Sequence, residues 1–452
     1  MHDPNNTERR LLIRAELARV DGVDPGAGEA ASQPMPKHRK MAASPLRFLR
    51  GSAQLYYADL ASGVLALPAA LLERVPVTRV MGDCHASNFG FLTEEGSHGD
   101  SVVFCPNDYD DACLGHAAWD LARCITSLVL AADYCAGVLD GRYDADDVDA
   151  PDRLTAATAK DARKAGHALL AAYRRTCLEG VNDPERRDSA MTHFSSGHVL
   201  RKPWKKARRR RAGGRDFATK STLAKEVEVR DGRPRFRDRP QRFSTLEPAR
   251  ADQVRAAFRP YVDDAVLDLV RRLGAGTGSV DLDRFYLLVG PEDSAGDADL
   301  PLCHVVEVKQ QRLSGPLHHF PGLRPENRLA PAHLTVDCQR RMQRSPDMVL
   351  DEAVWEDKHW LVRSRHHARV GIDPEDIALA KKKPGKGLAQ YAAACGEALA
   401  LAHARGDRRS TRFEAAAAAV LAEEGDALLD AAVAYAEQVI ADWGLLRAML
   451  PD

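Results

Sequence analysis

Two short acidic motifs in the first quarter of the chain could hold a magnesium ion beside a phosphate group. The first places Asp83 five residues before Asn88, and the second contains Asp108 and Asp110. Carboxylate and amide oxygens suit Mg²⁺, and a carboxylate can also orient a hydroxyl toward a phosphorus atom. Gly-Asp and Asn-Asp are also common turn dipeptides, so a pair of solvent-exposed acidic loops is the alternative interpretation. The motifs predict a phosphoryl-transfer site only if the fold brings them together.

A glycine-rich turn and a lysine in the second half of the chain could bind the phosphates. Gly274, Gly276 and Gly278 alternate with other residues, and Ser279 follows them. Such a turn lets backbone amides approach phosphate oxygens, although most glycine-rich turns only join two strands. Lys309 ends an otherwise apolar run, where burying an ammonium group is costly unless an anion meets it. We therefore expect Lys309 to contact the α and β phosphates of a nucleotide.

Short strands and long helices are expected to position these groups. Residues 77–81 and 101–105 are β-rich runs that end just before the two acidic motifs. Residues 302–309 form the expected strand that carries Lys309. Helical spacing of apolar residues continues over residues 121–139, 150–179, 387–404 and 413–446. The order of these elements predicts an α+β protein.

The composition indicates a folded, soluble protein. Hydrophobic residues make up 44% of the 452 residues, and 64 Lys and Arg nearly balance 65 Asp and Glu, so the overall charge suggests no polyanionic partner. The nine cysteines form no Cys-x-x-Cys pair and no secretory leader is apparent, which predicts reduced thiols and a cytoplasmic location. The best apolar run, residues 125–139, is interrupted by Asp133, so we expect no membrane-spanning helix.

Residues 201–215 are a local exception to this charge balance. They hold nine Lys and Arg residues and one aromatic residue, Trp204. Nucleic-acid binding is one interpretation of such a run. An exposed basic loop or a phosphate-facing surface is favoured, because the rest of the chain is balanced and only Trp204 could stack on a base.

Taken together, the motifs resemble a bacterial family, domain of unknown function 2252. The resemblance covers about residues 37–450 and rests on segments that occur in the same order. They are Ser44-Pro45-x-x-Phe48-Leu49-Arg50-Gly51, Gly82-Asp83-x-His85-x-x-Asn88-Phe89-Gly90, Asn107-Asp108-Tyr109-Asp110, Gly115, Trp119-Asp120-Leu121, residues 274–280, Val308-Lys309, Gln339-Arg340 and Ala402-His403-Ala404-Arg405.

The first motif is also similar to the active-site loops of aminoglycoside phosphotransferases and other kinase-like enzymes, whose pattern is His-Gly-Asp-x-His-x-x-Asn followed by an Asp-centred metal motif. This resemblance implies that Asp83 orients the acceptor hydroxyl and that Asn88, Asp108 and Asp110 hold Mg²⁺. It implies an ATP phosphate site made of Gly274, Gly276, Gly278, Ser279 and Lys309. Asp120, His85 and Arg50 are expected to brace the catalytic loop.

The same resemblance implies a two-lobed, protein-kinase-like fold with a circularly permuted order of lobes, because the catalytic loop here precedes the glycine-rich turn. The expected parts are an N-terminal helix and linker (1–36), a mostly helical lobe with the catalytic and metal motifs (37–245), a β-rich nucleotide-binding lobe (246–370) and C-terminal helices that pack on the first lobe (371–452). Met81 stands where the motif has histidine. The ion-pair partner of Lys309 is left open among Glu326, Asp337 and Gln339.

The expected function is an ATP- and Mg²⁺-dependent phosphotransferase that acts on an unknown hydroxyl-bearing small molecule or protein. A nucleotidyl (AMP) transferase could use the same metal ligands and lysine with the nucleotide reversed, and a non-catalytic, ATP-binding pseudokinase is a further alternative. A two-metal phosphoesterase is disfavoured, because His318-His319 and His366-His367 are adjacent pairs, whose side chains point to opposite sides of a strand.

Overall fold

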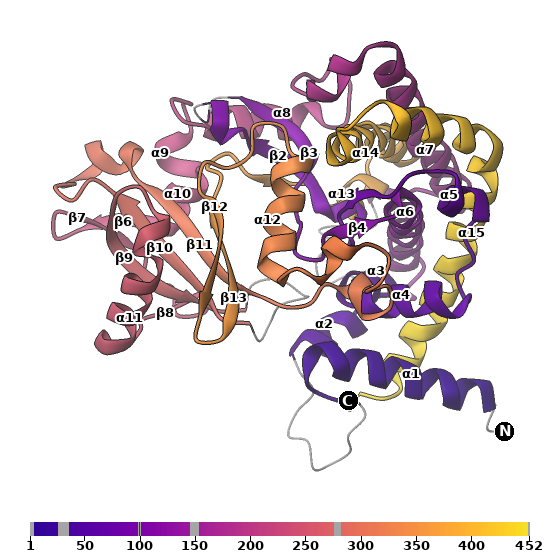
Figure 1. The fold of residues 1–452 in the computed structure, drawn as a ribbon, viewed down its shortest axis with the longest axis horizontal. Coiled ribbons are helices and arrows are strands. Elements are labelled where there is room, and N and C mark those ends of the chain that lie inside the picture. Colours follow the sequence, from indigo (N-terminus) through magenta and orange to yellow (C-terminus); the bar gives the residue numbers. More distant parts are fainter. Residues whose placement is uncertain are drawn as a thin grey trace.

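A six-stranded antiparallel sheet and a larger group of helices lie side by side, with helix α12 (Pro331–Met342) between them (Figure 1). The computed structural model describes residues 4–25, 36–97, 99, 101–144, 153–274 and 282–450. Helices and several antiparallel sheets both contribute, which confirms the predicted mixed α+β class.

Two small β units hold the acidic motifs. Strand β1 (Thr78–Val80) pairs with β4 (Cys113–Gly115), and β2 (Phe89–Thr93) pairs with β3 (Val102–Pro106). The first motif lies between β1 and β2, and the second lies between β3 and β4. The strands predicted at residues 77–81 and 101–105 are therefore confirmed, and each motif directly follows a strand.

Long helices form the core beside these strands. They are α6 (Ala117–Leu139), α7 (Ala159–Asn182), α14 (Pro384–Asp407) and α15 (Arg412–Arg447). Within the described ranges, α6 is the one helix that is long and apolar enough to cross a membrane, but 83% of its most apolar window is buried inside the protein. Its apolar surface is therefore covered by neighbouring helices, as in the core helix of a soluble protein.

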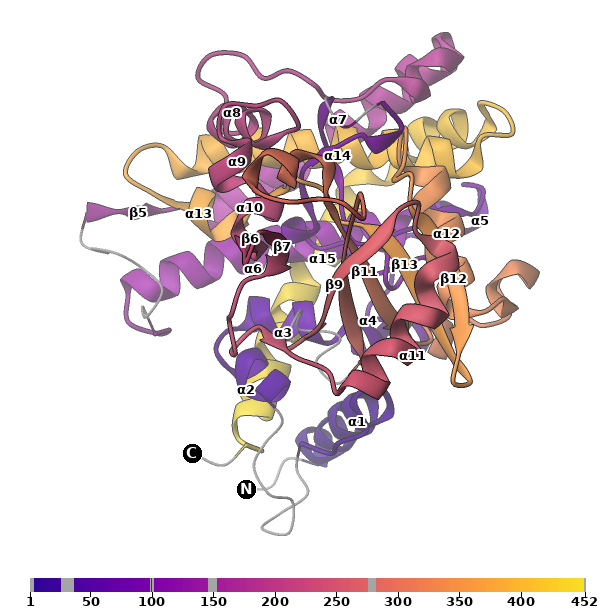
Figure 2. The ribbon, with the colours of Figure 1, turned by 90° about the vertical axis from the view of Figure 1, so that its left-hand side faces the viewer.

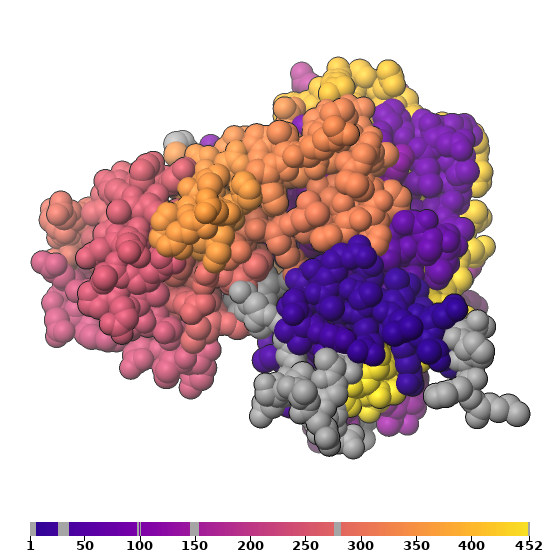
Figure 3. Space-filling view, turned by 60° about the horizontal axis from the view of Figure 1, so that its bottom comes forward, coloured from indigo at the N-terminus to yellow at the C-terminus, as the bar shows by residue number. Residues whose placement is uncertain are grey.

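Short helices at the start of the chain pack on its end. They are α1 (Pro4–Asp21), α2 (Pro36–Ala42), α3 (Pro45–Gly51), α4 (Ala53–Ser62) and α5 (Ala69–Glu73). Helix α1 contacts α4 and α15, and its Ile13 and Leu17 are fully buried. In the space-filling view the N-terminal segment lies against the orange segment of the chain (Figure 3), where His319 Nε2 and Glu16 Oε2 are 3.2 Å apart.

The large sheet has the strand order β12-β13-β11-β10-β9-β8. Its strands are β8 (Phe243–Ser244), β9 (Ala265–Arg272), β10 (Arg284–Gly290), β11 (His304–Gln311), β12 (Leu350–Trp355) and β13 (Lys358–Ser364). Residues 275–281 of the glycine-rich segment, which join β9 to β10, lie outside the described residues. Along the chain, β9 and β10 are therefore followed by the lysine strand β11, then by helix α12, and then by β12 and β13.

Side chains of β10 point alternately to the two faces of the large sheet, and each face packs against other parts of the chain. Phe285 and Leu287 face helix α11 (Pro248–Phe258), which lies in front of the sheet in Figure 2. Tyr286 and Leu288 face the other side, where they join a cluster with Phe217. Because side chains alternate along a strand, Glu307 and Lys309 of β11 share the second face with Val305.

The remaining helices and strands are shorter. They are β5 (Thr155–Ala156), which pairs with β15 (Leu379–Ala380); the hairpin of β6 (Val227–Arg230) and β7 (Arg233–Phe236); β14 (Val370–Gly371), which pairs with β2; and the helices α8 (Arg201–Arg210), α9 (Phe217–Lys220), α10 (Thr222–Glu226) and α13 (Pro374–Ala378). Strand β14 follows β13 directly and so ties the large sheet to the strands of the acidic motifs.

Candidate functional site

The predicted site residues from both halves of the chain line one cavity of about 400 Å³. Asp83, Asn88, Asp108 and Asp110 enter it from the loops that follow β1 and β3, and Lys309 enters it from β11. The cavity therefore lies between the loops of the helical region and one face of the large sheet.

Asp83 is held in place by an arginine of the core. Arg123 of α6, which is fully buried, donates from Nε to Asp83 Oδ1 at 2.7 Å. Burial raises the pKa of Asp83, and the charge of Arg123 opposes that rise. The second oxygen, Oδ2, lies 3.7 Å from His85 Nε2. One carboxylate oxygen is thus fixed, and the other is left for a ligand in the cavity.

Asn88 is oriented by the same loop. Its Nδ2 donates to the Asp83 carbonyl at 2.9 Å, so its Oδ1 is the atom left to meet a cation. Gly82 allows the loop to pass close to the second motif: its φ is +74°, and a Cβ there would lie 1.9 Å from the Asp111 carbonyl oxygen. A side chain at this position would force the two motifs apart.

Asp120 lies beneath the loop that carries the first acidic motif. This fully buried carboxylate accepts from the backbone amides of Met81 at 2.7 Å and Gly82 at 3.2 Å. It also lies 3.1 Å from Nε2 of His403, whose Nδ1 is 2.8 Å from the Tyr173 hydroxyl. These contacts tie the loop to α6, α7 and α14.

His85 and Arg50, the other two residues expected to brace the loop, line the cavity itself. Burial and the charges of Arg50 and Arg123 hold the pKa of His85 well below its usual value, which keeps the ring neutral near pH 7. Arg50 Nη1 is 4.0 Å from Glu375 Oε1, a weak pairing that leaves most of the guanidinium facing the cavity. The hydrogen bond to the Asp83 carboxylate comes from Arg123, which was not among the expected braces.

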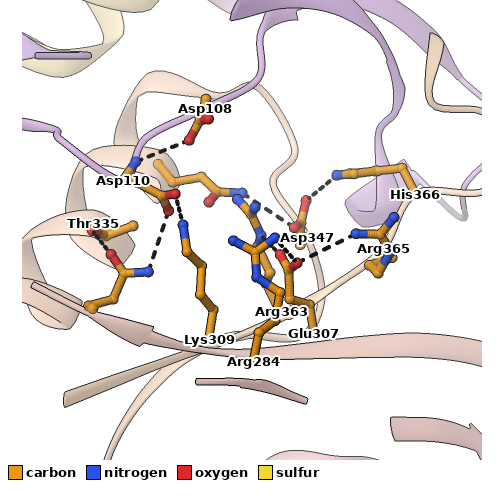
Figure 4. A network of polar contacts seen from close by, with 12 residues as sticks. Asp108, Asp110, Arg284, Glu307, Lys309, Thr335, Asp347, Arg363, Arg365 and His366 are labelled. Carbon is orange, nitrogen blue, oxygen red and sulfur yellow. Dashed lines mark hydrogen bonds and ion pairs between the residues drawn. The ribbon is translucent and has the colours of Figure 1, made fainter. Parts of the chain in front are cut away.

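Lys309 is almost completely buried, with 2% of its side chain exposed. Its ammonium donates to the carboxylate of Asp110, which also accepts from Gln311 Nε2 at 3.4 Å (Figure 4). The Asp110 amide in turn donates to Asp108 Oδ1 at 3.3 Å. Burial lowers the pKa of Lys309 to about 7, although the charge of Asp108 opposes this.

None of the three residues considered from sequence is the partner of Lys309. Asp337 pairs with Arg79 at 2.7 Å, Glu326 pairs with Arg324 at 3.3 Å, and Gln339 bonds to Gln343 at 3.1 Å. For Asp337 and Gln339 the reason is the orientation of α12, because the side chain that meets the lysine strand from this helix is Thr335, 3.4 Å from Gln311 Oε1. The partner of Lys309 is Asp110 of the second acidic motif.

The residues present fit a magnesium ion that takes part of its coordination from a ligand. Among the described residues, no three His, Cys, Asp or Glu side chains form a group that could hold a metal. Mg²⁺ is commonly bound by one or two protein oxygens together with water and phosphate oxygens. Asp108 and the free Oδ1 of Asn88 provide such a pair, whereas the Asp110 carboxylate contacts Lys309.

A second ionic group, which the sequence motifs did not predict, lies on the same face of the sheet. Glu307, two residues before Lys309, accepts from Arg363 Nε at 3.0 Å and Arg284 Nη1 at 3.1 Å, and Arg365 Nη1 lies 3.5 Å away (Figure 4). Burial alone would raise the pKa of Glu307, but these three positive charges lower it far below its usual value. A charged residue in an apolar strand was the available signal for Glu307, and the same signal existed for Arg123 in apolar helix α6.

The glycine-rich turn is described only at its first residue. Gly274 lines the cavity with a φ of +59°, a conformation that favours glycine. Gly276, Gly278 and Ser279 lie outside the described residues.

Residues 201–210 of the basic run form helix α8, where an exposed loop or a phosphate-facing surface was expected, and the residues of the run do not line this cavity. Trp204 is 6% exposed and is covered by its own helix, with the Arg208 guanidinium 4.9 Å from its ring centre. The aromatic residue available for stacking on a nucleic-acid base is therefore used in the core, which weakens that interpretation.

Comparison with protein families matches residues 32–138 and 152–449 to a family described as an uncharacterized protein conserved in bacteria, DUF2252. No curated protein and no solved structure matches the chain. The family match includes both acidic motifs, the lysine strand and the long helices that support them. The chain therefore belongs to the bacterial family DUF2252.

Proposed function

We propose that the protein is an ATP- and Mg²⁺-dependent phosphotransferase with a circularly permuted, kinase-like fold, acting on a hydroxyl-bearing small molecule or protein. The observation that carries the proposal is the contact between Lys309 and Asp110, residues 199 positions apart, in a cavity that also holds Asp83, Asn88 and Asp108. Lysine, paired carboxylates and an amide oxygen around one cavity are the parts that phosphoryl transfer requires.

The order of elements supports the kinase-like part of the proposal. In protein kinases a glycine-rich loop joins two strands, the next strand carries the phosphate-binding lysine, and a helix follows. Strands β9, β10 and β11 with helix α12 repeat that order here. Asp83 and Asp108 flank the β2–β3 hairpin, as the catalytic and metal aspartates of kinases flank a short segment of chain.

In the proposed mechanism the chain mainly positions charges. Asp83, fixed through Oδ1 by Arg123, uses Oδ2 to accept the hydrogen bond of the acceptor hydroxyl and takes its proton near the transition state. Asn88 and Asp108 would hold Mg²⁺, which supplies positive charge to the phosphate oxygens when it is bound. Lys309 exchanges its contact with Asp110 for the phosphates, which frees Asp110 to join the metal ligands.

A thermal-shift screen with product analysis tests this proposal. MgATP should raise the melting temperature of the wild-type protein, because a ligand that binds only the folded state stabilises it. The shift should be smaller for Lys309→Met and without Mg²⁺, and ADP should accumulate with the wild-type protein. Binding without turnover would favour the pseudokinase alternative, and AMP with diphosphate would favour nucleotidyl transfer. No shift with any nucleotide would refute the proposal. A cytoplasmic location also stays a proposal, with the nine free cysteines as its support.

A further inference from the structure

The end of the cavity beyond Lys309 is lined by arginines rather than by apolar side chains. We call Arg284, Arg363, Arg365 and Arg369 the arginine wall; all four line the cavity. They come from β10, from β13 and from the segment between β13 and β14. Figure 4 shows three of them gathered around Glu307, beside Lys309 on the same face of the sheet.

Among the described ion pairs, the carboxylates that meet this wall are Glu307 and Glu226. Glu307 is shared by Arg284, Arg363 and Arg365, and Arg365 has one further partner, Glu226, at 3.4 Å. Within the described part of the chain, Arg369 has no carboxylate within ion-pair distance, and the buried Nε of Arg365 has no acceptor. Among the described residues, eight Lys and Arg side chains line the cavity against five Asp and Glu. An excess of guanidinium groups at one end of a cavity favours a multiply charged anion there.

The wall offers little surface for a nucleobase. Ligand pockets for such groups are mostly apolar, with a few polar groups to fix orientation. Among the described residues that line this cavity, only Leu282 and Tyr286 have large apolar side chains. Tyr286 is 1% exposed, and the Arg365 guanidinium lies 4.5 Å from its ring centre. An uncharged base would therefore meet charge where it needs apolar contact, whereas phosphate oxygens would meet donors.

Resting on the proposed function, we infer that the arginine wall is a second phosphate-binding subsite, distinct from the one at Lys309. Its occupant is a phosphate group from one of two sources: the terminal phosphates of a nucleotide bound with its base toward solvent, or a phosphate carried by the acceptor. Guanidinium groups suit this role because they bind phosphate oxygens bidentately.

The two sources lead to different bond changes. With the nucleotide reversed, the acceptor oxygen bonds to the α-phosphorus, the bond from that phosphorus to the α–β bridging oxygen breaks, and diphosphate leaves with the electron pair. With a phosphorylated acceptor, the oxygen bonds to the γ-phosphorus and ADP leaves with the electron pair of the β–γ bridge. In both cases the hydroxyl proton passes to Asp83.

Calorimetric titration with inorganic triphosphate, without Mg²⁺, tests the subsite. Arg369→Gln should weaken binding at least about tenfold, the effect of losing one charge-assisted hydrogen bond, and it should fold normally because Arg369 has no ion-pair partner in the described structure. Arg233→Gln is the matched control, since Arg233 is exposed on the β6–β7 hairpin outside the cavity. Lys309→Met should keep most of the binding. Equal affinity of wild type and Arg369→Gln, or no binding by wild type, would overturn the inference.

Product analysis with ATP labelled at the α or the γ position separates this inference from the proposed function. If diphosphate is released and the α label is transferred, the arginine wall binds the phosphates of the reversed nucleotide. If ADP is released and phosphorylated acceptors accelerate its release, the arginine wall binds the phosphate of the acceptor. ADP release that is unchanged in Arg369→Gln overturns the subsite and leaves the proposed function standing. Triphosphate binding that depends on Arg369 without turnover of any nucleotide supports the subsite and counts against the transferase.

Discussion

Asp83 is the residue whose chemistry can be separated most cleanly from binding. Asp83→Asn keeps the oxygen that accepts from Arg123 but removes the negative charge that accepts a proton. Turnover of MgATP should therefore fall by about 10²–10⁴-fold, the usual contribution of a general base, while nucleotide affinity changes little. Steady-state turnover and calorimetric affinity, measured on the same preparation, check this.

The control for that experiment is Asp293→Asn, an exposed aspartate outside the cavity, which should behave as wild type. A parallel loss of affinity and turnover in Asp83→Asn would mean that Asp83 holds the ligand rather than the acceptor proton.

Asp108 should instead control how binding depends on magnesium. In the structure its carboxylate accepts from the Asp110 amide at 3.3 Å, a long bond, so Asp108→Ala should cost the fold little. The gain in nucleotide affinity on adding Mg²⁺ should disappear in this variant, because the main carboxylate ligand is gone. Titrations with and without Mg²⁺, together with the melting temperature of the free protein, measure both effects. An undiminished magnesium effect in a folded variant would place the metal elsewhere.

At the scale of elements, local patterns predicted where strands and helices lie but not which of them meet. The strands at residues 77–81 and 101–105 match β1 and β3, and the helix predicted at 413–446 matches α15. Helix α7 begins at Ala159, later than predicted, because the side chains of Thr158 and Asp161 form a capping box there. Such boundaries depend on side-chain hydrogen bonds that periodicity does not contain.

For the candidate site, too, the sequence predicted individual residues but not the contacts between distant segments. The aspartates and Lys309 carry their chemistry in short motifs, whereas Arg123 meets Asp83 across 40 residues and the arginine wall forms only when β10, β11 and β13 pair. Strand register decided which charges became neighbours: Glu307 lies opposite Arg363, and Lys309 lies opposite Arg284. Nothing in a single segment of sequence specifies that register.

Because the strand register places Glu307 among arginines, we predict that the stability of the protein depends on pH. The usual pKa of Glu307 is 4.5, and the folded protein lowers it, so its contribution to stability is complete above about pH 4.5 and is lost as the pH falls. Glu307→Gln leaves three guanidinium groups without their shared charge and should lower the free energy of unfolding by about 3 kcal/mol at pH 7. In denaturant titrations, the free energies of unfolding of Glu307→Gln and of the wild type should become more similar below about pH 4.5.

A strand glutamate at the surface provides the comparison. Glu352 of β12 pairs with His333 with 36% of its side chain exposed, and exposed pairs contribute about 0–1 kcal/mol, so Glu352→Gln should change stability little. If Glu307→Gln lowers the free energy of unfolding at pH 7 no more than Glu352→Gln does, the prediction is wrong. Repulsion among the arginines around Glu307 would then cancel the contribution of its carboxylate.

At the scale of the whole molecule, the cavity is lined by two regions that are far apart along the chain. The start of α1 and the end of α15 lie on the same side of the molecule in two perpendicular views (Figures 1 and 2). The permuted protein joins them through a flexible linker of about 20 residues, which spans roughly 25 Å on average. Opening the chain between Thr245 and Leu246, in the stretch between β8 and α11, places the lysine region first, as in the kinase order.

This permuted protein should keep a cooperative melting transition within a few degrees of wild type and should bind MgATP with similar affinity, because every strand pairing and the Lys309–Asp110 contact can form unchanged. Circular dichroism melting and calorimetry measure this. A second permutant, opened inside α6 between Thr126 and Ser127, should fail to fold, since that cut divides a core helix at two fully buried residues. If both permutants fail alike, the covalent order of the regions contributes to the fold, and the kinase-like description of two permuted lobes loses its main structural argument.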